Sequence, residues 1–120
     1  MGVLEDLESH YKEEAPIECV GLLLWNGDSI RLKNQARSEH RFFVSQQQLE
    51  ERLIPDQPVM AIYHSHPHRE AVPSGEDKEM MQYIAGVWPK VFHISLSPHG
   101  HRAYHVVDNL IEERNLPWKS

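Results

Sequence analysis

The segment Cys19–Trp25, with the sequence CVGLLLW, constrains the fold of this chain more than any other feature. It is an almost continuous apolar run, which predicts a strand that is buried on both faces. Asn26-Gly27 follows at once, and this dipeptide is a strong signal for a tight hairpin turn. The sequence therefore predicts that residues 28–36 return as a second, antiparallel strand.

Helical and strand-like patterns are interleaved along the rest of the chain. Apolar residues at helical spacing, or good helix formers between breaking residues, predict helices at residues 1–13, 46–53 and 74–86. Short β-rich segments predict further strands at residues 42–44, 59–63, 91–96 and 101–107. This interleaving predicts an α/β or α+β fold, in which helices pack on the faces of a mixed sheet.

The composition narrows the class of protein. The 120 residues suffice for one domain, which we expect to span residues 1–120. No apolar run approaches the roughly 20 residues that cross a bilayer, and the acidic start is not a secretory signal, so we expect no membrane association. A net charge of −6 argues against binding to nucleic acid. The single cysteine excludes an internal disulfide and fits a cytoplasmic protein.

Nine histidines are many for this length, and two of them stand at the end of a predicted strand. His64 and His66 are two residues apart, so in a strand their side chains project to the same face. Asp77 lies eleven residues after His66, in the first turn of the next predicted helix, and it can reach the same point. Two imidazoles and one carboxylate would leave a fourth tetrahedral position open for water, as in catalytic zinc sites.

Each of these residues also has a simpler interpretation. Ser74 and Asp77 match the serine-x-x-acid pattern that caps a helix N-terminus. His-x-His pairs also occur by chance on protein surfaces. Glu18, just before the buried run, is a candidate general base for a hydrolytic zinc site, or else a solvated loop acid. A helix cap and a metal ligand are compatible, because the cap fixes the helix end that carries Asp77.

Taken together, the motifs resemble the JAMM/MPN+ metalloprotease signature. That signature is a glutamate in an upstream strand region, then His-x-His, seven residues, serine, two residues and aspartate. Glu18, His64-x-His66 and Ser74-x-x-Asp77 meet all of these spacings. The resemblance extends over about residues 15–107, which is nearly the whole chain.

The resemblance implies a cytidine-deaminase-like fold with a curved mixed sheet between helices. It implies that His64, His66 and Asp77 bind one Zn²⁺, that Glu18 is the general base and then the general acid, and that Ser74 stabilises the oxyanion. The family hydrolyses peptide or isopeptide bonds, often at the C-terminal glycine of a ubiquitin-like protein. The short chain is most similar to compact prokaryotic members, some of which process a ubiquitin-like sulfur-carrier protein.

Several alternatives stay open at this point. Other compact JAMM domains belong to phage tail-assembly proteins, and some MPN domains are non-catalytic scaffolds. His64-x-His66-x-x-x-Glu70 also matches part of a cupin motif, although a helix is predicted where a cupin needs a strand. Cys19, which adjoins Glu18, is expected to be a buried structural thiol. The oligomeric state is open, with a homodimer as one possibility.

Overall fold

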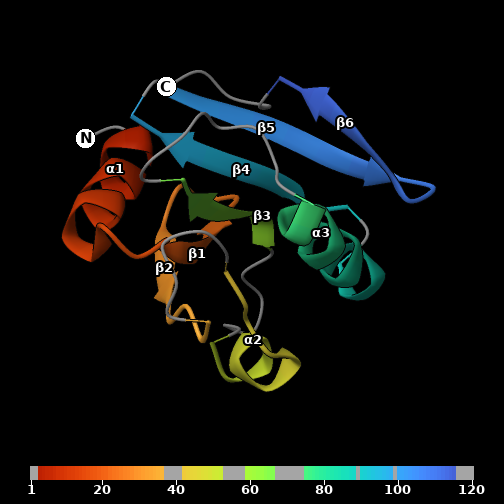
Figure 1. The fold of residues 1–120 in the computed structure, drawn as a ribbon, viewed down its shortest axis with the longest axis horizontal. Coiled ribbons are helices and arrows are strands. Elements are labelled where there is room, and N and C mark those ends of the chain that lie inside the picture. Colours follow the sequence, from red (N-terminus) through yellow and green to blue (C-terminus); the bar gives the residue numbers. More distant parts are fainter. Residues whose placement is uncertain are drawn as a thin grey trace.

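The computed structural model describes residues 3–36, 42–52, 59–66, 75–88, 90–98 and 100–115. Within these residues, three helices and six strands are interleaved (Figure 1). In chain order they are α1 (Val3–Glu14), β1 (Val20–Leu24), β2 (Ser29–Leu32), α2 (Gln46–Arg52), β3 (Val59–Ser65), α3 (Gly75–Val87), β4 (Phe92–Ser97), β5 (Gly100–Val107) and β6 (Leu110–Arg114).

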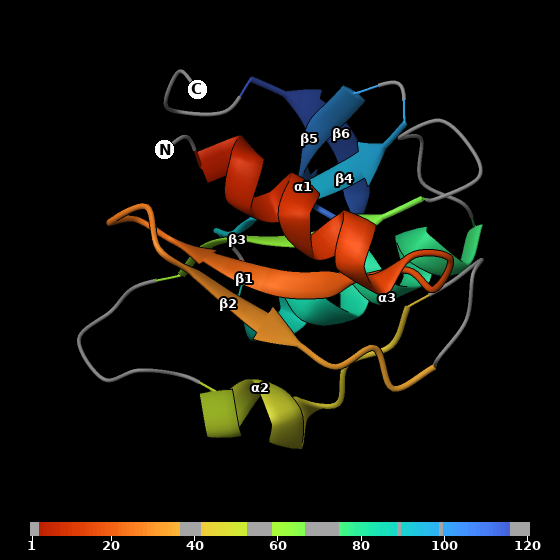
Figure 2. The same cartoon turned by 90° about the vertical axis from the view of Figure 1, so that its left-hand side faces the viewer.

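The six strands form a single sheet in the order β2-β1-β3-β4-β5-β6. β3 and β4 run parallel, and all other neighbours are antiparallel. α1 lies on one side of the sheet, and α2 and α3 lie on the other (Figure 2). The predicted mixed sheet with flanking helices is therefore confirmed. None of the helices among the described residues has both the length and the hydrophobicity needed to span a bilayer.

Apolar side chains fill the space on both faces of the sheet. On the face that α2 and α3 cover, the buried cluster includes Val20, Leu22, Leu49, Ile62, Met80 and Ile84. On the face that α1 covers, it includes Leu7, Cys19, Leu23, Tyr63, Ile94 and Leu96. β1 and β3 are thus buried on both faces, as the apolar run in β1 predicts.

The strand register brings the predicted site residues to the centre of the sheet. Val20 of β1 lies opposite His64 of β3, and His64 lies opposite Ser95 of β4. Side chains two residues apart on a strand point to the same face, so His64 faces the side of α2 and α3 together with Val20 and Ser95. The site therefore forms on the face opposite to α1.

A close contact between β1 and β3 explains the glycine at position 21. Gly21 lies opposite Tyr63, and a Cβ atom on Gly21 would stand 2.3 Å from Cζ of the Tyr63 ring. The missing side chain lets the ring lie across β1, where the Tyr63 hydroxyl is 2.6 Å from Nδ1 of His10 on α1. This contact attaches α1 to the strand that carries His64.

One predicted strand does not form, and one observed strand was not predicted. Residues 42–44 alternate in burial like a strand but form none. The carbonyl of Phe43 accepts a backbone hydrogen bond, from the N–H of Gln35 at 2.9 Å, but the N–H of Phe43 donates to the side chain of Asn34, so no ladder follows. β6 was missed because its sequence, LIEER, is mostly polar. Asp108 and Asn109 have φ angles of 51° and 64°, so they form the tight turn that joins β5 to β6.

Candidate metal centre

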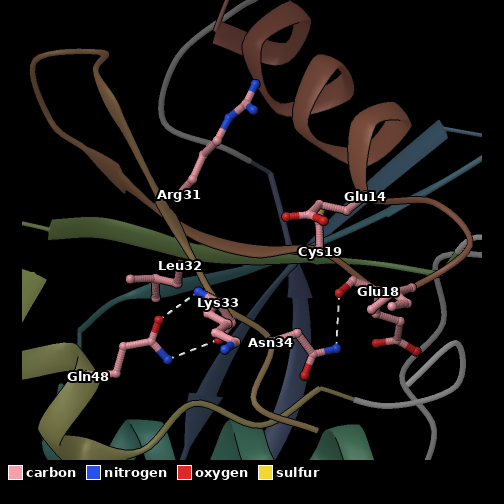
Figure 3. A pocket seen from close by; sticks show the side chains of 9 residues that line it. Glu14, Glu18, Cys19, Arg31, Leu32, Lys33, Asn34 and Gln48 are labelled. Atoms are coloured by element: carbon pink, nitrogen blue, oxygen red, sulfur yellow. Dashed lines mark hydrogen bonds between the residues drawn. The ribbon is translucent and has the colours of Figure 1, made fainter. Parts of the chain in front are cut away.

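Glu18 lies in the connection between α1 and β1, and its side chain is completely buried. Because Val20 is paired with His64, Glu18 lies beside the carboxyl end of β3. A cavity of about 400 Å³ borders Glu18, and Arg31 and Lys33 also line it (Figure 3). The carboxylate oxygens of Glu18 are themselves buried, and the described lining of this cavity includes none of His64, His66 and Asp77.

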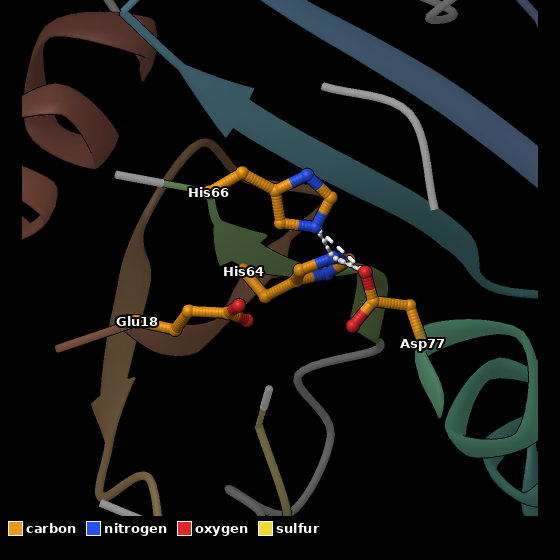
Figure 4. Close-up of side chains that lie close together, drawn as sticks. All are labelled: Glu18, His64, His66 and Asp77. Carbon is orange, nitrogen blue, oxygen red and sulfur yellow. Dashed lines mark hydrogen bonds and ion pairs between the residues drawn. The ribbon is translucent and has the colours of Figure 1, made fainter. Parts of the chain in front are cut away.

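His64 and His66 converge at the end of β3, as their spacing predicts. Their Nε2 atoms are 3.1 Å apart, and both side chains are buried (Figure 4). His66 follows the last residue of β3, but its backbone N–H still donates to the carbonyl of Leu96 at 2.6 Å. This bond continues the alternation of the parallel strand pair by one residue, so both imidazoles stay on one face.

Asp77 reaches the histidine pair from the first turn of α3. Its Oδ2 atom is 2.7 Å from Nε2 of His66 and 3.7 Å from Nε2 of His64. α3 is held in this place by Met80 and Ile84, which pack into the apolar cluster under the sheet. A helix N-terminus also favours the ionised form of a carboxylate.

The four residues form one compact group of potential ligands. One ligand atom each from Glu18, His64, His66 and Asp77 can be chosen so that all four lie within 4.8 Å of one another, and all four residues are buried (Figure 4). Burying two carboxylates next to each other is costly unless a positive charge compensates them. A divalent cation would supply that charge, so the group is consistent with a metal site.

The distances between donor atoms fit a small tetrahedral ion. With metal–ligand distances of about 2.1 Å, neighbouring donors in a tetrahedron lie about 3.4 Å apart. The triangle formed by the Nε2 atoms of His64 and His66 and Oδ2 of Asp77 has edges of 2.7, 3.1 and 3.7 Å. Imidazole nitrogen with carboxylate oxygen is a common donor set for Zn²⁺.

Three neighbours of this group were not predicted from the sequence. The ring of Phe42 stacks on His64, with centroids 4.4 Å apart and planes inclined by 19°. The Oγ atom of Ser95 is 3.4 Å from Nε2 of His64. Burial, with a smaller contribution from His64, lowers the pKa of His93 to about 3, so this side chain stays neutral. These contacts depend on the register of β3 and β4 and on the course of the chain after β2, which no local sequence pattern encodes.

The remaining predicted site residues divide into two groups. Ser74, the expected oxyanion donor, and Glu70, the cupin alternative to Asp77, lie outside the described residues. Cys19 is buried as expected, and burial raises the pKa of its thiol to about 12, so it is not an activated nucleophile.

The fold and the buried Glu-His-His-Asp group define a domain of the JAB/MPN class. The model of a family described as prokaryotic homologs of the JAB domain matches residues 2–110, and the chain belongs to this family. Among curated proteins, no match was found.

Solved structures support the same fold. A Desulfitobacterium hafniense protein of known solution structure is 21% identical, with a TM-score of 0.72 over 93% of this chain and 85% of that one. A JAB1/MPN domain protein from Archaeoglobus fulgidus is 22% identical, with a TM-score of 0.63 over 96% of this chain and 92% of that one. At these identities the likeness concerns the fold alone.

Proposed function

We propose that this protein is a zinc-dependent peptidase or isopeptidase that uses Glu18 as its general base. The observation that carries the proposal is the position of the buried Glu18 carboxylate within 4.8 Å of the triangle formed by His64, His66 and Asp77. The triangle would hold the ion, and Glu18 would remain available for proton transfer.

Zinc, when bound, supplies Lewis acidity, which polarises a carbonyl oxygen and makes water acidic at neutral pH. The proton transfers and the stabilisation of the oxyanion are assigned to side chains of the protein itself. Glu18 takes a proton from the attacking water and passes it to the leaving amine, which a weakly basic carboxylate does well in a buried site. The resemblance assigns to Ser74 the hydrogen bond to the developing oxyanion, and this assignment stays a prediction.

The proposed substrate is a ubiquitin-like or sulfur-carrier protein that ends in glycine. Such a tail is narrow and extended, and it can pair with the edge of a sheet. Among the described strands, β2 is an edge strand, and the cavity beside Glu18 lies next to it. Lys33 and Arg31, which is ion-paired with Glu13, border this cavity, as does Glu14, so its rim carries charges of both signs. These features support an extended peptide lying along β2 with its scissile bond near Glu18.

A cleavage experiment tests this function directly. The zinc-loaded protein is incubated with a panel of ubiquitin-like proteins that carry a C-terminal extension after Gly-Gly, with and without chelator, and intact masses are measured. We expect the extension to be removed from at least one of them, only when zinc is present. The absence of cleavage across the panel, with one zinc bound per chain, would contradict the proposed substrate class and favour a non-catalytic scaffold.

The metal content of two variants distinguishes the cupin-like alternative from the proposed zinc peptidase. In the structure a helix, α3, begins at Gly75, where a cupin needs a strand, and Asp77 joins the two histidines. Loss of zinc from Asp77→Ala but not from Glu70→Ala is the expected result. The reverse pattern would favour the cupin reading. A phage tail-assembly role shares the zinc chemistry and differs in the protein that is cleaved, so the substrate panel distinguishes it.

A further inference from the structure

We propose that Asn34 is a positioning residue for Glu18, because its side chain fixes the peptide bond that follows Glu18. The side-chain amide of Asn34 donates from Nδ2 to the carbonyl oxygen of Glu18 at 3.0 Å (Figure 3). The catalytic consequence rests on the proposed function, whereas the structural effect on Glu18 does not.

Both polar groups of the Glu18–Cys19 peptide unit are bound by side chains. The carbonyl of Glu18 accepts from Asn34, and the N–H of Cys19 donates to Oγ of Ser65 at 2.8 Å. Ser65 stands between His64 and His66 in sequence, and its own N–H donates to the carbonyl of Cys19 at 3.1 Å. The backbone of Glu18 is thus held from one side by the strand of the histidines and from the other by Asn34.

The other end of the Asn34 amide reaches a second part of the site. Its Oδ1 atom accepts from the N–H of Ala36 at 3.0 Å and from the N–H of Phe43 at 3.1 Å. Phe43 follows Phe42, whose ring stacks on His64. One buried side chain therefore connects the backbone of Glu18 to the segment that covers a predicted metal ligand.

Only an amide side chain meets both demands at this position. Asn34 donates on one side and accepts on the other, and it is only 8% exposed. Aspartate would keep the acceptor for Ala36 and Phe43 but would place a second acceptor against the carbonyl of Glu18. The choice of asparagine follows from the orientation of the Glu18–Cys19 peptide unit.

This orientation matters because the position of the Glu18 carboxylate depends on it. A general base has to lie within about 2.6–3.2 Å of the proton donor. Displacements of about 1 Å can reduce a rate by about 100-fold. If the peptide unit rotates, the Cα–Cβ bond of Glu18 turns with it and moves the carboxylate relative to His64 and His66.

A matched control is Gln48, whose side chain holds the backbone of Lys33, the residue before Asn34. Gln48 donates from Nε2 to the carbonyl of Lys33 at 2.9 Å and accepts from the N–H of Lys33 at 2.6 Å (Figure 3). This is the same kind of side-chain attachment to the same segment, and it does not touch Glu18. Gln48→Ala therefore reports what the loss of such an attachment does to the fold, apart from any effect on Glu18.

The experiment compares Asn34→Ala, Asn34→Asp and Gln48→Ala with the wild type. In metal-free protein, the hydrogen-exchange rate of the Cys19 amide is measured by NMR. In zinc-loaded protein, the zinc content and the kcat and KM for an extended ubiquitin-like protein are measured. Asn34→Asp retains the acceptor oxygen Oδ1 for Ala36 and Phe43, so it replaces Asn34→Ala in the comparison if that variant does not fold.

We expect both Asn34 variants to speed exchange of the Cys19 amide by about tenfold or more, since one anchor of the peptide unit is lost. We expect kcat to fall by about 10- to 100-fold, with KM and zinc content nearly unchanged. Gln48 lines the cavity beside Glu18, so Gln48→Ala serves as the control for exchange and zinc content alone, and both should stay within about threefold of the wild type. Unchanged Cys19 exchange in the Asn34 variants, or an equal rise in Cys19 exchange in Gln48→Ala, would overturn the proposal. Faster exchange in a protein that cleaves no substrate would contradict the proposed function and leave the positioning of Glu18 established.

Discussion

The Nε2 atom of His66 lies 2.7 Å from Oδ2 of Asp77, although His66 directly follows β3, Asp77 lies in α3, and the two are eleven positions apart. Both side chains are completely buried. This pair joins the end of β3 to the start of α3, and it forms one edge of the donor triangle whose third corner is His64. The site is therefore a product of the tertiary fold, and the loss of one donor should affect both metal binding and the proposed chemistry.

Replacing Asp77 by asparagine should weaken zinc binding by at least about 100-fold. Changes to groups that only support a ligand already cost about 10- to 100-fold, and removal of a charged donor costs at least as much. Isothermal titration of the metal-free protein with zinc measures the effect. Glu79→Gln, an exposed position on the same helix, is the control and should bind zinc like the wild type. If Asp77→Asn binds zinc with the affinity of the wild type, Asp77 is not a zinc ligand.

Replacing Glu18 by glutamine should separate metal binding from turnover. The variant should keep zinc affinity within about threefold and lose at least about 100-fold in kcat, because only proton transfer is removed. Competition with a chromogenic chelator and the cleavage assay give the two values. A large loss of zinc affinity would instead make Glu18 a fourth ligand, which would close the open position and argue against a hydrolase.

Gly21→Ala should destabilise the protein by about 1–3 kcal/mol or more, because the added Cβ overlaps the Tyr63 ring in a packed interior. Gly86→Ala in α3 is the matched control, since a Cβ there meets nothing within 4 Å. It should be neutral or stabilising by up to about 1 kcal/mol, as alanine favours helix. Urea unfolding of both variants measures the difference. Equal free energies of unfolding for Gly21→Ala and Gly86→Ala would contradict this prediction, because they would show that the Tyr63 ring moves aside without loss of stability.

The neutral His93 should make the protein less stable in acid. Its pKa is lowered to about 3, chiefly by burial, and its Nε2 atom has no hydrogen-bond partner among the described residues. Below about pH 6.5 the unfolded chain binds a proton at this position that the folded protein does not, so acidification favours unfolding.

Between pH 7 and pH 5 this single group should cost about 2 kcal/mol of stability. The free energy of unfolding is measured at pH 7 and at pH 5 for the metal-free wild type and for metal-free His93→Leu. The difference between the two proteins isolates the contribution of His93, because all other groups titrate in both. His101→Leu, at an exposed position on β5, is the control and should behave like the wild type. The same pH dependence in all three proteins would contradict the assignment to His93.

The sequence predicts much of the fold because hydrophobic periodicity is a local property. The buried run before Asn26-Gly27 became β1, and the alternating residues after Val91 became β4. β6 was missed because a polar edge strand carries little periodic signal. Residues 42–44 show the pattern of a strand but make a single backbone bond among the described residues, from the N–H of Gln35 to the carbonyl of Phe43, while the N–H of Phe43 donates to the Asn34 side chain.

The candidate site could be predicted in its motifs but not in its surroundings. Two histidines two residues apart in a strand must share a face, so their convergence follows from local geometry. The stacking of Phe42 on His64, the approach of Ser95 and the attachment of Glu18 by Asn34 depend on how distant segments align. Such contacts are fixed by strand register and tertiary packing, which one sequence does not reveal.

The most direct test of the central claim is anomalous diffraction at the zinc absorption edge from crystals of the zinc-loaded protein. We predict one peak per chain, about 2.0–2.2 Å from Nε2 of His64, Nε2 of His66 and an Oδ atom of Asp77, with the Glu18 carboxylate outside bonding distance. A peak elsewhere, or a closed site in which Glu18 completes the coordination, would contradict the account.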